Sequence, residues 1–294
     1  MKMLNQRNHG MFVARRKPVS LPALLGWVVF AGMVCASGLR VHGAPGELNA
    51  EEIINRAVER AKDAQQQAKN RPYTYSRVSV VEDIDDQGVV TERKEKNYLM
   101  VPFAGAFYQR LVRTNGQPLS GKERKQEEEK ERKFRQRLAE SQSAKVEDKQ
   151  RIILGRELVS RFQFTLEGRE TVEGRAAYVL SFLPRAGAVE KKVDDRVMNR
   201  LAGKLWIDMQ EFEMAKIEFR LTEKVSIGWG GILASLQKFA FTLTRTRVTE
   251  GVWFNRLFRG DIEGRKLLGA LRLKIRDEAS DFKPAPAEAT PVVR

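Results

Sequence analysis

The sequence contains very little cysteine and histidine, with one Cys and two His among 294 residues. All three (Cys35, His9 and His42) lie in the first 43 residues, which we predict to be an export leader. The rest of the chain therefore has no Cys–His nucleophile, no Ser–His–Asp triad, no CxxC redox motif and no His or Cys ligand for a metal. These absences favour a protein without catalytic activity, metal or cofactor.

The sequence also has no apolar run of comfortable membrane-spanning length. The uncharged stretch from Leu21 to Ala36 has 16 residues, whereas a transmembrane helix needs about 20. Basic residues precede it, and Val41 and Gly43 take the positions of small or neutral residues before a cleavage site at Ala44. This pattern is typical of a cleaved secretory signal, with an uncleaved anchor as the alternative. We predict a signal peptide over residues 1–43, a periplasmic location and no transmembrane segment after cleavage.

Acidic residues do not balance the basic ones. The chain has 53 Lys and Arg against 38 Asp and Glu, a net charge of +15. Six of the basic residues and no acidic ones fall in the leader, which leaves 47 against 38, or +9. Such a surface attracts anionic envelope components such as lipid headgroups. No nucleic-acid motif is present, so nucleic acid is not expected as a partner.

Two helical segments stand out after the leader. Apolar residues recur at helical spacing from Asn49 to Lys69, and Asn49 with Glu52 forms a capping-box pattern. The stretch from Lys122 to Arg135 has 12 charges in 14 residues and predicts a solvated helix or a partly disordered insertion spanning 119–150. Weaker helices are predicted over 146–160 and 194–201.

Alternating apolar and polar residues predict about nine strands joined by hairpin turns. This alternation indicates an antiparallel sheet covered on one side. We predict an α+β, mainly β fold: a curved antiparallel half-barrel with helices as a lid over an apolar concave face. The strands are expected at 73–81, 89–101, 106–113, 162–166, 177–183, 204–208 leading into 215–221 as one candidate, 238–248, 252–262 and 267–275.

Several chemical motifs are incomplete. Asp83 begins a calcium-loop pattern that has Lys94 where a bidentate Glu is required, so we interpret the segment as a hairpin turn. Asp208, Glu211 and Glu213 would allow a His-free glycosidase, but we interpret them as turn and solvent-face residues.

The segment 225–236 (VSIGWGGILASL) is apolar and rich in glycine. It is either a movable lid or rim over a cavity, or a turn and helix packed on the sheet.

One segment carries a family resemblance. Gly203–Asp208 (GKLWID), a short turn at 209–212 and the alternating strand from Met214 resemble the LolA/LolB-like outer-membrane lipoprotein-sorting proteins. The resemblance implies an unclosed β half-barrel whose helices cover an apolar cavity, and a protein that carries or senses acyl chains in the envelope. The charged segment 119–150 and the insertion around Trp229 depart from that pattern.

These observations lead to a functional hypothesis. Residues 44–283 are expected to form one LolA/LolB-like domain, followed by a disordered tail at 284–294. The domain is expected to bind or carry a lipid or a lipoprotein acyl chain. A structural or regulatory envelope protein with a protein partner is the alternative, and a His-free hydrolase is a third reading. The candidate cavity or lid residues are Phe164, Ile217, Phe219, Trp229, Ile232, Phe239 and Phe241.

Overall fold

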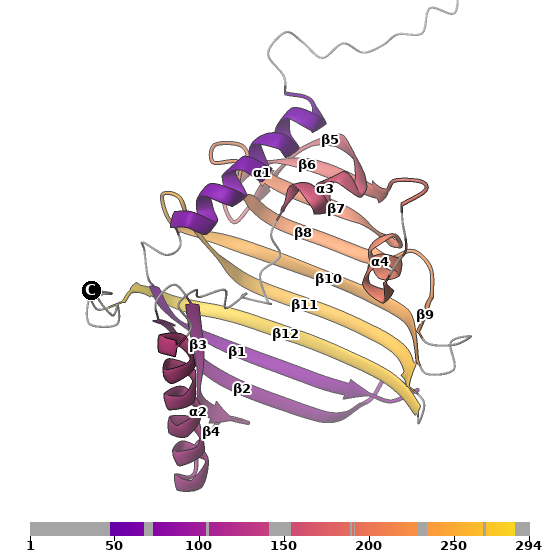
Figure 1. Cartoon of the computed structure of the whole chain (residues 1–294). Helices are drawn as coiled ribbons and strands as arrows, with labels where there is room; N and C mark the ends of the chain where they lie inside the picture. Colours follow the sequence, from indigo (N-terminus) through magenta and orange to yellow (C-terminus); the bar gives the residue numbers. More distant parts are fainter. Residues whose placement is uncertain are drawn as a thin grey trace, which may run out of the picture. The chain divides into compact units, whose positions relative to one another are not determined.

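A computed structural model describes residues 48–67, 73–103, 106–140, 154–188, 190, 192–227, 234–266 and 269–285. Helices and strands follow one another as drawn in Figure 1. The helices are α1 (Ala50–Gln67), α2 (Gly121–Glu140), α3 (Arg156–Ser160) and α4 (Val193–Met198). The strands are β1 (Tyr73–Ile84), β2 (Val90–Phe103), β3 (Ala106–Thr114), β4 (Gln117–Pro118), β5 (Phe162–Val172), β6 (Arg175–Pro184), β7 (Leu201–Asp208), β8 (Met214–Leu221), β9 (Val225–Ile227), β10 (Ala234–Thr249), β11 (Val252–Lys266) and β12 (Gly269–Pro284).

The strands form one open antiparallel sheet. Its order is β4-β3-β2-β1-β12-β11-β10-β8-β7-β6-β5, and β9 pairs with β10. Most neighbours are joined by hairpin turns, but β1 pairs with β12, so that Arg77 lies opposite Ala279. The predicted mainly β fold with a curved, unclosed sheet is confirmed. The number of strands was underestimated: the sheet has 12, because short strands such as β4 and β9 carry too few residues to show alternation.

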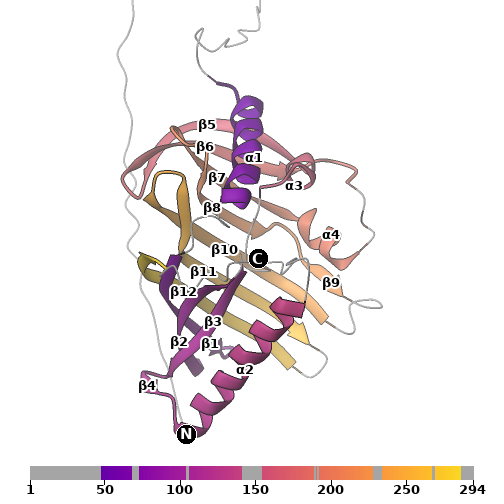
Figure 2. The same ribbon diagram turned by 60° about the vertical axis from the view of Figure 1, so that its left-hand side comes forward.

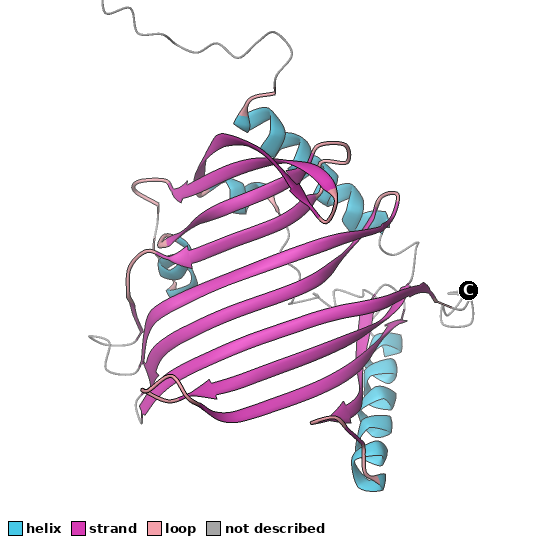
Figure 3. Cartoon of the chain, turned by 180° about the vertical axis from the view of Figure 1, so that it is seen from behind, coloured by secondary structure: helices cyan, strands magenta, loops and turns pink. Residues whose placement is uncertain are grey.

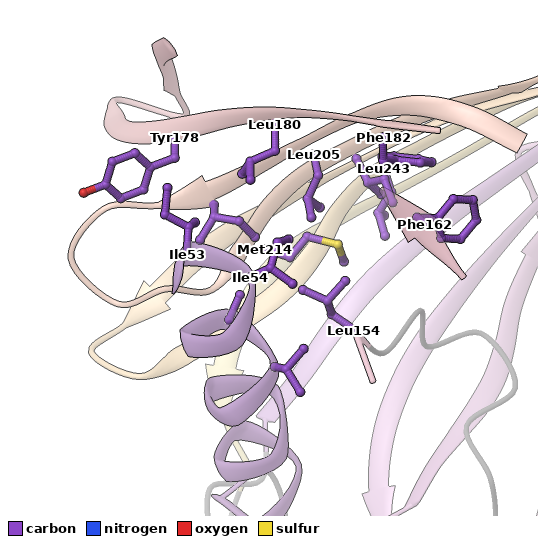
Figure 4. Packing of buried hydrophobic residues seen from close by; sticks show 14 of the residues in the cluster. Ile53, Ile54, Leu154, Phe162, Tyr178, Leu180, Phe182, Leu205, Met214 and Leu243 are labelled. Atoms are coloured by element: carbon purple, nitrogen blue, oxygen red, sulfur yellow. The ribbon is translucent and has the colours of Figure 1, made fainter. Parts of the chain in front are cut away.

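Helix α1 begins as the capping pattern predicts. The Glu52 N–H donates to Asn49 Oδ1 at 3.0 Å, and the Asn49 N–H donates to Glu52 Oε2 at 2.9 Å. Figures 1 and 2 show the helix alongside β5 to β8. Ile53 and Ile54 on its apolar face point at the sheet and pack with residues such as Leu205 and Met214 (Figure 4). This packing forms the main core of the protein.

Helix α2 packs on the other face of the sheet. Arg77 faces the same side as α1 and lies opposite Tyr98, so Leu99 and Val101 of β2 point to the opposite side. Those side chains pack with Phe134 of α2. We call the face with α1, α3 and α4 the inner face and the other the outer face. The predicted charged helix is thus present over 121–140, and 141–150 lies outside the described residues.

Two other helix predictions are corrected. The helix expected over 146–160 is present as α3, which starts at Arg156; residues 146–153 lie outside the described part of the chain. The helix expected over 194–201 ends earlier, at Met198, because Leu201 begins β7 and is buried in the core. The leader (1–43) and most of the tail (286–294) also lie outside the described residues.

Candidate functional site

A cavity of about 730 Å³ lies between the inner face of the sheet and the short helices α3 and α4. Leu158 of α3 and Val197 and Met198 of α4 form its helical wall. The opposite wall comes from the sheet, where every second residue of a strand faces inward. The exception is the stretch 255–258 of β11, which lies at a register shift in its pairing with β10. The sheet residues lining it are Tyr75, Arg77, Phe162, Phe164, Phe182, Leu201, Leu205, Ile217, Phe219, Phe239, Phe241, Leu243, Asn255, Arg256, Leu257, Phe258, Ile275, Asp277 and Ala279, and Leu154 precedes α3.

Five of the seven residues expected at a binding site line this one cavity. Three strands bring them together: Phe164 comes from β5, Ile217 and Phe219 from β8, and Phe239 and Phe241 from β10. The four phenylalanines are only half-buried, so apolar surface is left facing the cavity. The other two, Trp229 and Ile232, lie outside the described residues. A ligand-binding role for all seven stays a prediction.

Further lining residues were missed by sequence reasoning. Phe162 and Phe182 sit on the same alternating positions as Phe164, so the period of two could have identified them. Phe258 could have been found in the same way on β11. Arg77 and Asp277 could not, because they meet only through the pairing of β1 with β12, across 200 positions of the chain.

The cavity has a polar side. The Arg77 guanidinium donates a 2.7 Å hydrogen bond to Asp277 and one of 3.2 Å to Gln109 on β3. Both members of the ion pair are mostly buried, with side-chain exposures of 14% and 22%. Asn255 and Arg256 of β11 line the same side. The cavity is therefore amphipathic: one wall is aromatic and aliphatic, and the other offers paired charges.

The helices cover the inner face unequally. Helix α1 fills the space above β6, β7 and β8 with its own side chains and contributes none of the cavity lining. The cavity lies beneath α3 and α4, which supply its helical lining. Among the described residues, α1 therefore belongs to the core, and the two short helices cover the cavity.

The glycine-rich segment 225–236 is a strand at each end. Ile227 lies opposite Ala234, and Val225 opposite Leu236, in an antiparallel pair. The alternative of a turn and helix is therefore wrong for 225–227 and 234–236, which form strands. Residues 228–233, which would form the tip of the lid, lie outside the described residues.

The reading of Asp208 and Glu213 as solvent-face residues is wrong. Asp208 is 1% and Glu213 4% exposed, and each is held by arginine. Arg175 donates to both oxygens of Asp208 at 2.7 and 3.0 Å, and Arg245 donates to Glu213 Oε2 at 2.7 Å. Sequence alternation could not reveal this burial, because the arginine partners come from other strands.

Glu211 is also engaged, at the turn between β7 and β8. Its carboxylate accepts hydrogen bonds from Arg247 and from the Trp253 indole, the latter at 2.7 Å. Burial opposes ionisation of Glu211, but these hydrogen bonds outweigh it and lower its pKa. None of the three carboxylates lines the cavity. Each of them is instead paired with an arginine of the sheet: Asp208 with Arg175, Glu211 with Arg247 and Glu213 with Arg245.

The G-x-L-W-I-D segment is structural as well. Leu205 and Ile207 are fully buried in the inner core. Trp206 points to the outer face, where its indole donates to Glu170 at 2.8 Å and Lys216 lies 4.3 Å from the ring centroid. These contacts explain the motif without any ligand.

No family model and no curated protein matches this sequence. Among solved structures, a domain from Vibrio parahaemolyticus described as an outer membrane lipoprotein-sorting protein domain is 12% identical, with 80% of this chain and 94% of that chain covered and a TM-score of 0.30. A LolA superfamily protein from Nitrosomonas europaea is 13% identical, with coverages of 82% and 95% and a TM-score of 0.28. A chain of the Pseudomonas aeruginosa MucA/MucB complex is 12% identical, with coverages of 79% and 99% and a TM-score of 0.21. Two of these three structures are described in terms of the family that the sequence resembles, and at these identities and TM-scores they assign no role to this chain.

Among the described residues, no helix is both long enough and apolar enough to cross a bilayer.

Proposed function

We propose that this protein is an exported, periplasmic binding protein or carrier that holds the acyl chain of a lipid or lipoprotein in the cavity beneath α3 and α4. The observation that carries the proposal is the cavity itself. Its volume of about 730 Å³ lies within the range of about 300–1,000 Å³ of small-molecule sites. Its half-buried phenylalanines leave apolar surface exposed, and a bound chain would cover that surface.

The energetics suit an acyl chain. Each buried methylene contributes about 0.8 kcal/mol, so about ten of them supply roughly 8 kcal/mol. Association itself costs several kcal/mol, so the net affinity depends on how many methylenes the cavity takes up. The paired charges of Arg77 and Asp277 would face the polar end of the ligand.

Binding without chemistry is supported by the polar lining. The cavity-lining residue that could serve as a general base, Asp277, is held in an ion pair by Arg77. The carboxylates at 208, 211 and 213 are engaged elsewhere in the sheet.

The test is binding of a fluorescent fatty acid to delipidated protein, with native mass spectrometry of protein purified gently. We expect stoichiometric binding, which Phe239→Glu should weaken at least about tenfold because a carboxylate would enter the apolar wall. The matched control is Leu183→Glu, since Leu183 is 60% exposed on β6 and does not line the cavity. Circular dichroism and thermal unfolding would establish that both variants fold.

A well-folded protein that carries no lipid and binds no fatty acid would refute the proposal. That result would favour the alternative, an envelope protein of this fold that acts through a protein partner.

A further inference from the structure

Figure 3 shows the sheet from the side opposite to that of Figure 1. The outer face of the sheet carries a hollow of about 730 Å³, distinct from the inner cavity. It crosses the strands from β7 to β2, and its floor has small side chains, among them Ala240 and Thr242 of β10. Six basic and three acidic side chains line it, a surplus of three positive charges. The basic residues are Arg93, Lys204, Arg220, Arg259, Lys274 and Arg276.

Two of the arginines stand directly opposite each other. Arg259 of β11 pairs in register with Arg276 of β12, so their side chains project side by side from the outer face. Like charges in directly opposed positions destabilise a sheet. Arg276 also donates a 2.7 Å hydrogen bond to Glu278, whereas Arg259 has no such partner among the described residues, so an anion beside Arg259 would offset the remaining repulsion.

Three of the described cations form no close ion pair, although Lys274 lies in register opposite Asp261 and Glu82. Within the described part of the chain, Arg220, Arg259 and Lys274 have no carboxylate within ion-pair distance. The other three basic residues of the hollow are paired: Arg93 with Glu82, Lys204 with Glu167 and Arg276 with Glu278. The unpaired side chains are exposed and lie on β8, β11 and β12.

We infer that this basic outer face, defined by Arg220, Arg259, Lys274 and Arg276, docks on the surface of a bilayer that contains anionic phospholipids. Guanidinium and ammonium groups bind phosphate through charge-assisted hydrogen bonds. The four cations spread over neighbouring strands of an exposed sheet face, an arrangement that meets several headgroups at once. Docking here leaves the inner cavity and helices α3 and α4 uncovered, because they lie on the opposite face.

The experiment measures co-sedimentation of the full chain with vesicles of equal parts phosphatidylglycerol and phosphatidylcholine, and with phosphatidylcholine alone. We expect binding to the anionic vesicles only. Raising the ionic strength from about 0.1 M to about 1 M should abolish it, since the screening length falls from about 10 Å to about 3 Å. Each cation near such a surface is worth about fivefold in partitioning, so Arg259→Gln with Arg276→Gln should weaken binding about 25-fold.

The matched control is Lys122→Gln with Lys125→Gln, which removes the same charge from exposed positions of α2. It should leave binding within about twofold. The double arginine variant removes a like-charge pair but also the ion pair of Arg276 with Glu278, so thermal unfolding is measured to establish that it folds. An equal loss of vesicle binding in the two double variants would overturn the inference. Binding to vesicles made only of phosphatidylcholine would overturn it as well. The inference would also be overturned if the protein bound soluble polyphosphate tightly through Arg259 and Arg276 but did not bind anionic vesicles.

The inference does not depend on occupancy of the cavity. Fatty-acid binding should be unchanged in Arg259→Gln with Arg276→Gln, and vesicle binding unchanged in Phe239→Glu. Failure of one proposal is therefore distinguishable from failure of the other.

Discussion

At the scale of single residues, Glu213 joins three elements that are distant in the sequence. It precedes β8, accepts a hydrogen bond from Arg245 of β10 and lies 3.2 Å from Arg60 Nε of α1. The approach of Arg60 is an ion pair that is not aligned as a hydrogen bond. Arg60 in turn donates to the Gly251 carbonyl at 2.8 Å, which ties α1 to the β10–β11 turn.

Removing the charge of Glu213 should therefore leave two arginines uncompensated. We expect Glu213→Gln to lower the free energy of unfolding by about 3 kcal/mol, as for other broken buried pairs. Urea denaturation measures the change. Glu128→Gln, at an exposed position of α2, is the control and should stay within about 0.5 kcal/mol. A loss equally small in Glu213→Gln would show that Arg245 and Arg60 find other partners.

Gly203 illustrates a different constraint, imposed by backbone proximity. A Cβ at this position would lie 1.9 Å from the Glu218 carbonyl oxygen of β8. Gly203→Ala must therefore push β7 and β8 apart, and we expect a loss of about 1–3 kcal/mol in stability. Gly121→Ala, where a Cβ would meet nothing within 4 Å, is the matched control in the same thermal unfolding experiment. Equal stability of the two variants would contradict this account of the glycine in the motif.

At the scale of elements, α2 depends on few contacts. Phe134 packs with Phe103 and Tyr108, and Arg110 of β3 donates two 2.7 Å hydrogen bonds to Glu131. The Arg110 hydrogen bonds lower the pKa of Glu131 in spite of its partial burial. Glu127 is buried and accepts hydrogen bonds from the Tyr108 hydroxyl at 2.7 Å and the Leu111 N–H at 3.1 Å. The remaining side chains of the helix are mostly charged and solvated, so these contacts hold it on the sheet.

Phe134→Ala should release α2 without disturbing the rest of the fold. We expect amide hydrogen exchange across 121–140 to accelerate at least about tenfold, a change of about 1.4 kcal/mol, because the aromatic contact is lost. Exchange in α1 and β5 to β8 should not change, since they belong to a separate hydrophobic cluster. If exchange accelerated equally everywhere, α2 would be part of the global cooperative unit.

At the scale of the whole molecule, the carboxylate–arginine network sets the response to acid. Burial opposes ionisation of Asp208, but the hydrogen bonds from Arg175 and from the N–H groups of Gln210 and Glu211 outweigh it and lower its pKa below 3.8. Glu211 likewise has its pKa lowered below 4.5. Because the folded-state values are depressed, the stabilisation is complete above the unfolded-state pKa values and is lost as pH falls through the folded-state values.

The protein should therefore lose stability below about pH 4.5 and change little between about pH 6 and 8 from this source. Asp208→Asn tests the assignment: the stability difference between parent and variant should be largest near neutral pH and shrink towards about pH 3. Unfolding free energies measured across this range supply the comparison. A difference that is constant with pH would mean that Asp208 acts through packing and not through its charge.

Local features of this fold were readable from the sequence. The capping residues of α1, the alternation of β5 to β8 and the turn at Asp85 each depend on residues a few positions apart. Asp85 Oδ1 accepts from the N–H groups of Gln87 and Val89, as its place in a hairpin turn predicts. Alternation also identified which side of each strand is apolar, and so most of the aromatic wall of the cavity.

Only the tertiary structure decided what those surfaces meet. Alternation does not specify the pairing of β1 with β12, which creates the polar side of the cavity at Arg77 and Asp277. Alternation also does not specify the register that sets Arg259 opposite Arg276. Nor does it identify the arginines that pair with the buried carboxylates of Asp208 and Glu213. The physical reason is that local periodicity records how a segment divides between apolar and polar faces, whereas register and ion pairing depend on chain segments that only folding brings together.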